Sequence, residues 1–201
     1  MRVIGICGGS GSGKGAVCVA FSRFGIPSID TDAVYRSMTE RKSRCLDELS
    51  EAFGAGILLA DGSLDRKKLA EVVFAHTDDA RRRKQLLESI SHKHILARTR
   101  EIIENYRLEG VPAVLVDAPL LFESGFDKEC DVTVAVIADD SVRIERIMAR
   151  DSISEAAASA RIAAQIPNAE LASRCTYVIY NNGSIDELSE RVSELAALLL
   201  G

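Results

Sequence analysis

The sequence predicts an α/β fold in which helices cover both faces of a parallel sheet of five strands. Short apolar runs rich in β-branched residues alternate along the chain with longer segments of helical periodicity. The composition fits one globular domain, because 47% of the 201 residues are apolar and 27% are charged. A glycine-rich segment also follows the first apolar run directly. These observations indicate a three-layer α/β/α unit, and they leave the order of the strands open.

Five apolar runs are predicted to be buried strands, and four segments with apolar residues three or four apart are predicted to be helices. The strands are 3–7, 26–29, 111–116, 132–137 and 177–179, and the helices are 13–23, 141–150, 154–165 and 184–200. Residues 40–108 break this alternation, since their apolar residues recur only at helical spacing. We interpret this segment as an all-helical insertion within a single unit whose core is formed by residues 1–39 and 109–201.

The charge and the cysteines disfavour several classes of protein. With 25 basic and 30 acidic residues, the net charge of −5 is poorly suited to general nucleic-acid binding. The five cysteines are odd in number and never spaced as CxxC, which disfavours a disulfide framework or a structural zinc site. No apolar run has the length of a membrane span. We therefore expect a cytoplasmic protein with no nucleic-acid, membrane or obligate protein partner.

Residues 8–14, GGSGSGK, match the phosphate-binding pattern GxxxxGK between a predicted strand and a predicted helix. Glycines let the backbone curl so that consecutive N–H groups and the helix N-terminus hold polyphosphate oxygens, which Lys14 also reaches. In this context we favour a P-loop over a glycine-rich turn with an accidental lysine. The candidate ATP phosphate-binding residues are Gly9, Ser10, Gly11, Ser12, Gly13, Lys14, Gly15 and Ala16.

Position 15 departs from the P-loop pattern, in which Ser or Thr offers a hydroxyl to Mg²⁺. Gly15 has no hydroxyl, and Ala16 follows it. Because Mg²⁺ keeps several waters and takes few protein ligands, we expect weaker metal binding and not its loss. A nucleotide binder with decayed chemistry stays open as an alternative.

Three aspartates follow the carboxyl ends of predicted strands, where ligands of open α/β sheets bind. Asp30 and Asp32 follow the second strand. One of these carboxylates can accept a hydroxyl proton, and one can support the metal shell. The alternative, which is equally favoured for either residue alone, is that Asp30 or Thr31 simply caps the next helix. Asp117 ends a run of the Walker B type, AVLVD, whose aspartate supports Mg²⁺, often through water. A capping role is its alternative.

Arginines on one predicted helix are candidates for stabilising a phosphoryl group in transfer. Arg143, Arg146 and Arg150 share one helix face by their spacing, and Arg161 follows on the next helix. Arginine forks stabilise the charge that spreads over the transferring phosphoryl oxygens, and a hinged lid excludes water. From the spacing alone, a solvated surface with acidic partners such as Asp151 is the favoured interpretation.

Taken together, these motifs resemble those of the dephospho-coenzyme A kinase family, from about residue 3 to residue 195. The loop is similar to the family's GLTGGIGSGK, and IDTD at 29–32 resembles its IDAD. The other similar segments are DR..L at 65–69, LE.I.H at 87–92, PLLFE at 119–123, RD…RI..Q at 150–165 and VIYNNG, similar to VIDN.G, at 178–183. The P-loop alone is generic, whereas this ordered set is specific.

The resemblance implies a P-loop NTPase fold with an acceptor-binding helical insertion and an arginine-bearing lid at about 141–166. It implies transfer of a phosphoryl group from ATP, with Mg²⁺, to the ribose 3′-hydroxyl of dephospho-CoA, the last step of coenzyme A biosynthesis. By position it implies roles for the following residues: Asp32, Lys14 and Arg150 in catalysis, Asp30, Asp32, Arg66 and His92 at the acceptor, Arg146, Arg150 and Arg161 in the lid, Asn181 near the adenine, and Asp117 as an indirect metal support.

Two alternatives to this activity stay open. One is another P-loop kinase with a nucleoside or nucleotide acceptor, which would need the 40–108 helices to accept a smaller ligand. The other is the decayed nucleotide binder, which Gly15 supports. Retention of Asp32, Lys14 and the lid arginines argues against it.

Overall fold

The computed structural model describes residues 1–74 and 79–201, and the chain divides into two compact units. The first, which we call the core unit, consists of Met1–Asp30 and Ile103–Gly201. The second, which we call the helical unit, is Thr31–Ile102. The predicted insertion, 40–108, overlaps most of the helical unit and includes residues 75–78, which lie outside the described residues.

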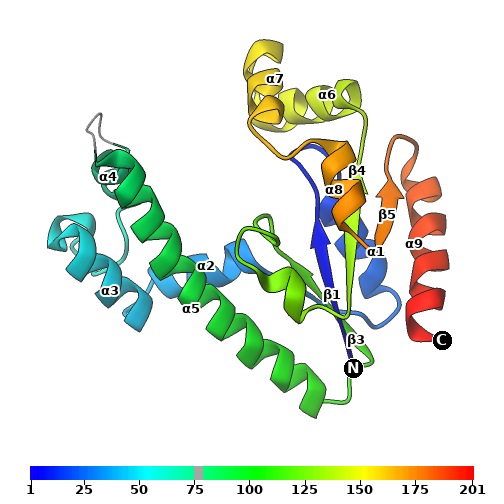
Figure 1. Ribbon diagram of the computed structural model, residues 1–201, viewed down its shortest axis with the longest axis horizontal. Coiled ribbons are helices and arrows are strands. Elements are labelled where there is room, and N and C mark those ends of the chain that lie inside the picture. The colour runs from blue at the N-terminus through cyan, green and yellow to red at the C-terminus, as the bar shows by residue number, and fades with distance from the viewer. Residues whose placement is uncertain (75–78) are drawn as a thin grey trace. The chain divides into compact units, whose positions relative to one another are not determined.

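A parallel sheet of five strands forms the centre of the core unit (Figure 1). The strands are β1 (Arg2–Cys7), β2 (Ser28–Asp30), β3 (Ala113–Asp117), β4 (Val132–Ile137) and β5 (Tyr177–Tyr180). Their order across the sheet is β2-β3-β1-β4-β5. The predicted α/β class and the parallel sheet are therefore confirmed, and the structure supplies the strand order that the sequence left open.

Two strands begin later than their apolar runs predict, and both delays have the same cause. β2 begins at Ser28 after Pro27, and β3 begins at Ala113 after Pro112. Proline has no N–H to donate to a ladder, so it stands at the start of a strand and not within it. β3 also extends by one residue beyond the predicted run, because Asp117 stays in register with Ile6 of β1.

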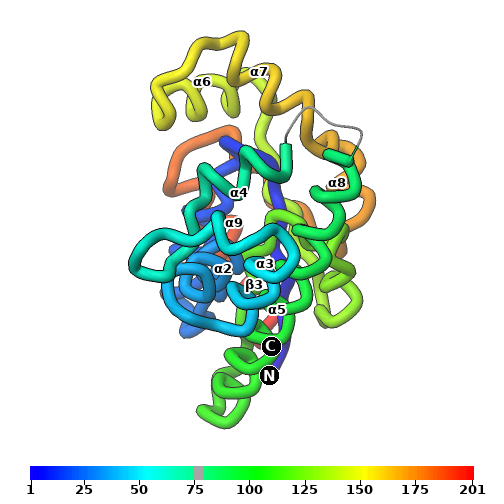
Figure 2. Tube along the Cα trace, turned by 90° about the vertical axis from the view of Figure 1, so that its left-hand side faces the viewer, coloured from blue at the N-terminus to red at the C-terminus, as the bar shows by residue number. Residues whose placement is uncertain are grey.

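Five α-helices and one 3₁₀ turn surround the sheet within the described part of the core unit. They are α1 (Lys14–Ser22), η2 (Phe126–Glu129), α6 (Asp140–Asp151), α7 (Glu155–Ala163), α8 (Asn168–Arg174) and α9 (Ile185–Leu200). Four of these α-helices lie at predicted positions, whereas α8 was not predicted, because its seven residues are too few to show a period. α6 and α7 lie side by side, as Figure 2 shows.

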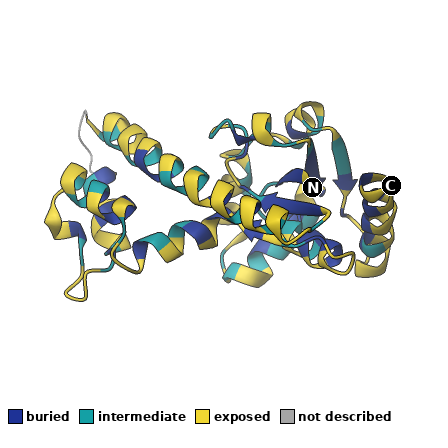
Figure 3. Cartoon of the chain, turned by 90° about the horizontal axis from the view of Figure 1, so that it is seen from below, coloured by how far each residue is buried: buried dark blue, intermediate teal, exposed yellow. Residues whose placement is uncertain are grey.

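The two faces of the sheet are covered by different helices. α1 and α9 pack on the face that carries Ile4 and Ile6, with Phe21 and Val192 fully buried between the layers. Residues alternate along a strand, so Gly5 and the other odd positions of β1 face the opposite side. The strands are mostly buried, whereas the outer surface of α9 is exposed (Figure 3).

The helical unit is built from α2 (Thr31–Thr39), α3 (Arg44–Phe53), η1 (Ala55–Ile57), α4 (Arg66–Val73) and most of α5 (Ala80–Leu108), which ends in the core unit. Its own core consists of buried residues from these elements: Cys45, Leu46, Leu49, Ile57, Leu64, Leu69, Val73 and Ile90. The side chains of Ser43 and Asp65 cap α3 and α4 by accepting the N–H of Leu46 and Lys68. None of the described helices in the chain is long and apolar enough to cross a membrane.

Candidate active site

The glycine-rich segment forms a tight loop between β1 and α1, as the motif predicts. Gly11 and Gly13 have φ angles of 78° and 88°, in the left-handed region that favours glycine. A Cβ at Gly13 would also collide with the amide of Asn181, and one at Gly9 would collide with the guanidinium of Arg143. Glycine is therefore favoured at positions 11 and 13 by backbone conformation, and at position 9 by close packing against Arg143.

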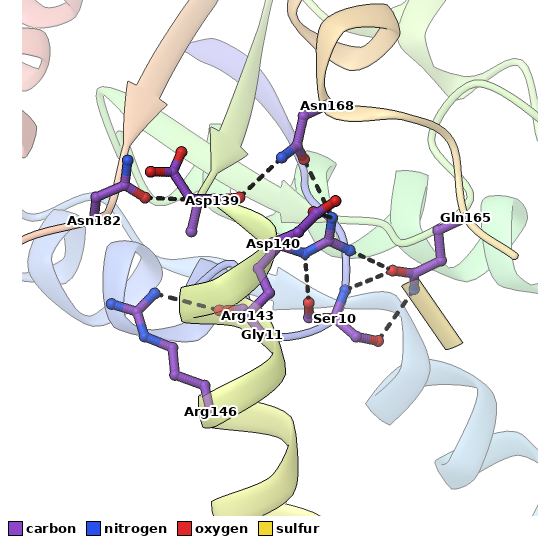
Figure 4. A network of polar contacts seen from close by, with 10 residues as sticks. Ser10, Gly11, Asp139, Asp140, Arg143, Arg146, Gln165, Asn168 and Asn182 are labelled. Carbon is purple, nitrogen blue, oxygen red and sulfur yellow. Dashed lines mark hydrogen bonds and ion pairs between the residues drawn. The ribbon is translucent and has the colours of Figure 1, made fainter. Parts of the chain in front are cut away.

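Arg143 of α6 and Gln165 hold Ser10 of the loop from two sides (Figure 4). Arg143 Nε donates to the Ser10 carbonyl at 2.9 Å, and its Nη2 donates to Gln165 Oε1 at 2.8 Å. The same Oε1 accepts the Ser10 N–H at 3.0 Å, and Gln165 Nε2 donates to Ser10 Oγ at 3.1 Å. Arg143 is only 2% exposed, so the hydrogen bonds of its guanidinium are shielded from water. Shielded hydrogen bonds from a charged group are stronger than neutral or solvent-exposed ones.

The next two carbonyls of the loop are held in the same manner. Arg146 Nη1 donates to the Gly11 carbonyl at 3.3 Å and to the Asn181 carbonyl at 3.0 Å. Asn181 is buried, and its Nδ2 donates to the Ser12 carbonyl at 2.8 Å. Three consecutive loop carbonyls are thus bound by protein donors. A loop fixed by its carbonyls is preorganised to present N–H groups to an anion.

Lys14 and two aspartates meet at the carboxyl ends of the strands. The Lys14 ammonium forms an ion pair with Asp117, and each side chain is 16% exposed. Asp117 is in register with Asp30 of the neighbouring strand β2. Cys18 Sγ lies 3.9 Å from Asp117 Oδ2, and burial, followed by the nearby carboxylate, raises the pKa of this thiol to about 12. The sheet therefore places one cation and two carboxylates beside the loop, as the motifs predict.

Gly15 is exposed, and a Cβ built on it would meet no atom of the described residues within 4 Å. Within residues 1–74 and 79–201, no side-chain hydroxyl therefore takes the place of the missing Ser or Thr at this position. Among the described residues, no three His, Cys, Asp or Glu side chains form a metal-ligating cluster. The carboxylates of Asp30 and Asp117 still suit Mg²⁺, which prefers oxygen ligands and takes only one or two from the protein.

Of the predicted acceptor residues, Asp32, Arg66 and His92 lie on three helices of the helical unit. Asp32 is exposed in the first turn of α2, and His92 is half-buried on α5. Arg66 donates to Thr39 Oγ1 at 2.9 Å, and its guanidinium lies 5.5 Å from the centre of the Tyr35 ring. Tyr35, which the sequence analysis did not single out, therefore joins α2 to α4 at this candidate site.

Two of the predicted lid arginines share one carboxylate at the turn between α6 and α7. Arg150 donates to both oxygens of Asp151, at 2.7 and 2.9 Å, and Arg161 forms an ion pair with the same group. Arg150 and Arg161 together hold the pKa of Asp151 well below its usual range. Both arginine side chains are substantially exposed, at 61% and 41%.

Arg143, Arg146 and Arg150, which are predicted to share one helix face, make two different kinds of contact. The first two arginines bind the loop, and Arg150 alone is left at the end of α6 in a salt-bridged surface. Spacing places residues on one face but does not reveal which of them meets a distant backbone segment. The one sequence signal for this network is the RI..Q segment, which contains Gln165.

Comparisons with known proteins point to one family. The family model described as dephospho-CoA kinase matches residues 2–187. The chain is 39% identical to the dephospho-CoA kinase of Anaeromyxobacter dehalogenans over 201 residues, which cover 100% of this chain and 93% of that protein. The dephospho-CoA kinase of Geobacter sulfurreducens is 38% identical, with 98% of each chain covered.

A solved structure has a similar fold over the whole length. The crystal structure of a protein from Thermus thermophilus matches with a TM-score of 0.79 and 34% identity, covering 100% of this chain and 98% of that one.

Proposed function

The chain belongs to the dephospho-CoA kinase family, and from this premise we propose how its residues transfer a phosphoryl group from ATP to the ribose 3′-hydroxyl of dephospho-CoA. The chain is a kinase of the P-loop type by its family and its fold. The observation that carries the proposal is the preorganised loop, in which Arg143, Arg146 and Asn181 bind three consecutive carbonyls.

In the proposed mechanism, the loop N–H groups and Lys14 hold the β- and γ-phosphates of ATP. Phosphoryl transfer needs positioning and charge stabilisation more than covalent chemistry, so a rigid loop supplies much of the catalysis. The ion pair with Asp117 supports this role, because it orients Lys14 within a partly buried site.

Asp32 acts as the general base that accepts the proton of the 3′-hydroxyl. Two features support this assignment. Asp32 follows β2 by two residues, and its side chain is exposed to solvent and therefore accessible to a ligand. Asp30 supports the same acceptor from the end of β2, beside Asp117 in the sheet register.

The helical unit binds the acceptor through Arg66 and His92. A cation on α4 suits the pyrophosphate of dephospho-CoA, and the stacking of Arg66 on Tyr35 fixes its direction. Asn181, buried beneath the loop and next to the end of β5, lies in the segment that we assign to the adenine side of ATP.

Arg150 and Arg161 provide the movable charges. Their shared partner, Asp151, is a surface carboxylate, and exposed ion pairs are weak. Both arginines are therefore free to exchange Asp151 for the phosphoryl oxygens when ATP binds. Arg146, which donates to the Gly11 carbonyl, keeps its place and supports the phosphate site.

Mg²⁺ is the metal that we assign to this reaction, and the residues fit it. Asp117 and Asp30 would hold it, together with water at the open space beside Gly15. When bound, the ion neutralises charge on the phosphates of ATP. We also propose a cytoplasmic location, which the five free thiols support, since thiols persist in reducing compartments.

Initial rates with three acceptors test this proposal against the other kinase activities. We expect ADP release to depend on dephospho-CoA and to be negligible with adenosine or AMP. A comparable rate with either smaller acceptor would assign the chain to another kinase activity. ATP binding without turnover of any acceptor would favour a decayed nucleotide binder.

A further inference from the structure

Two cysteines from opposite ends of the chain lie side by side next to the phosphate-binding loop. The Sγ atoms of Cys7 and Cys175 are 3.5 Å apart, although the residues are separated by 168 positions. Cys7 is the last residue of β1 and is buried, whereas Cys175 follows α8 and is half-buried. The mechanism of phosphoryl transfer gives neither thiol a role.

We propose that Cys7 and Cys175 form a reversible disulfide on oxidation by a peroxide, and that this modification switches off the neighbouring phosphate-binding loop. The formation of the disulfide is independent of the kinase activity. The inhibition deepens the proposed function and rests on it.

The geometry is close to that of a disulfide. A disulfide holds its sulfur atoms about 2.05 Å apart, so these two must approach by about 1.5 Å. Cys7 is fixed by the sheet, where it is in register with Ala135 of β4. Cys175 has extended backbone in the short connection between α8 and β5, outside both elements. We therefore expect Cys175 to make most of the movement.

A small oxidant can reach both sulfurs by separate routes, because Cys175 is only half-buried and Cys7 lines a cavity. Cys7 lines a cavity of about 230 Å³ together with Gly8, Gly9, Gln165 and Leu171. This volume exceeds the roughly 30 Å³ that one water occupies in the liquid, so a peroxide fits. The same cavity is bordered by the loop, which places the oxidation and the phosphate site next to each other.

Cys175 is suited to be the attacking thiol, and Cys7 to be the resolving one. The hydrogen bond between the two sulfur atoms is the largest effect that lowers the pKa of Cys175, and Arg174 adds to it. The same hydrogen bond, together with burial, raises the pKa of Cys7. A lowered pKa favours the thiolate, which is the reactive species, and the half-buried position of Cys175 leaves its sulfur accessible.

The reaction balances with hydrogen peroxide as the named oxidant. The Cys175 thiolate attacks one peroxide oxygen, the O–O bond breaks, and the leaving hydroxide takes up a proton to become water. The resulting sulfenic acid is then attacked by the Cys7 sulfur, whose proton leaves with the sulfenic hydroxide as a second water. Two thiols are oxidised to a disulfide while one peroxide is reduced to two waters.

The disulfide would strain the two segments that hold the loop, which are the end of β1 at Gly8 and the Asn168–Arg143 contact. Cys7 precedes Gly8, whose surroundings are so tight that a Cβ would lie 2.6 Å from the Val136 carbonyl. On the other side, Cys175 directly follows α8, and the first residue of that helix, Asn168, accepts from Arg143 at 3.4 Å. A displacement of Cys7 would therefore shift Ser10 through Gly8, and a displacement of Cys175 would shift it through Asn168 and Arg143.

Peptide mapping and kinase assays of the full chain test this proposal together. The reduced protein is treated with hydrogen peroxide, digested without reductant and analysed by mass spectrometry. We expect a linked pair of peptides containing Cys7 and Cys175, lighter by two hydrogen atoms than their sum. Turnover should fall by about 100-fold, the cost of misplacing reacting groups by an ångström, and dithiothreitol should restore it.

Two variants separate this disulfide from general oxidation. Cys175→Ala should keep its turnover under peroxide, whereas Cys130→Ala, which removes another half-buried thiol of the core unit, should be inhibited as the wild type is. Absence of the linked peptides, or equal inhibition of Cys175→Ala and the wild type, would overturn the proposal. If the reduced wild type lacks kinase activity, the proposed function fails, while peptide mapping still decides whether the disulfide forms.

Discussion

At the scale of single residues, Asp32 carries the proposed proton transfer. The variant Asp32→Asn keeps the shape of the side chain but cannot accept the hydroxyl proton. We expect turnover to fall by roughly 10²–10⁴-fold, the usual contribution of a general base, while the Kd of ATP stays unchanged. Steady-state rates and a fluorescent nucleotide titration measure the two quantities. Near wild-type turnover would remove Asp32 from the role of base.

Gly15 is the second residue with a specific expectation, because no atom in the described part of the chain fills its Cβ position. We expect Gly15→Ser to lower the Mg²⁺ concentration needed for half-maximal rate, since the added hydroxyl is a metal ligand in other P-loops. Gly15→Ala is the matched control, because it adds the Cβ without the hydroxyl. Equal Mg²⁺ requirements in the two variants would show that water already replaces the hydroxyl.

The carboxylate of Asp151 gives a prediction about pH. Its pKa is lowered in the folded chain by Arg150 and Arg161, so the ion triad is intact above the ordinary Asp pKa of about 3.9 and is lost as pH falls through the lowered value. An NMR titration of the carboxyl carbon should therefore give a midpoint below that of a free aspartate. In Arg150→Ala, which removes the bidentate partner, the midpoint should rise. An unchanged midpoint would contradict the assigned cause.

At the scale of elements, Arg143 and Arg150 of α6 differ in burial and in the groups that they bind. Arg143 is buried and binds the loop, and Arg150 is exposed and binds a surface carboxylate. We expect Arg143→Ala to lower the free energy of unfolding by about 1–3 kcal/mol, the cost of leaving buried polar partners unpaired, and to raise the KM of ATP.

Arg150→Ala is the matched variant on the same helix. Its free energy of unfolding should stay within about 0.5 kcal/mol of wild type, as for most surface substitutions, while its kcat falls. Urea denaturation and steady-state kinetics of the two variants separate the duties. Equal loss of stability in both would contradict the assignment of Arg143 as the residue that fixes the loop.

The elements also show what the sequence reveals and where it stops. Unbroken apolar runs predict the central strands, and the motif GxxxxGK predicts the loop, because both signals are local. The burial of Arg143 depends on Ser10 and Gln165, which lie 133 and 22 positions away, and an arginine is ordinarily expected at the surface. Tyr35 was missed for the same reason, since its partner Arg66 comes from another helix.

At the scale of the whole molecule, the chain divides into a core unit and a helical unit, and we propose that the helical unit binds the acceptor. The core unit contains the sheet, the loop and the arginine-bearing helices, and the helical unit has a hydrophobic core of its own. The strand order β2-β3-β1-β4-β5 could not be predicted, because apolar runs specify burial and not the choice of neighbours. That order brings Asp30, Asp117 and Lys14 together.

The central claim is that this chain transfers a phosphoryl group to dephospho-CoA although its P-loop has Gly15 in place of a hydroxyl-bearing residue. The most direct measurement is mass spectrometry of dephospho-CoA after incubation with the purified chain and Mg²⁺-ATP, with fragmentation to locate the added group. We predict a gain of one phosphoryl group on the ribose 3′-oxygen, matched by release of ADP. Unchanged dephospho-CoA in the presence of bound ATP would contradict the claim.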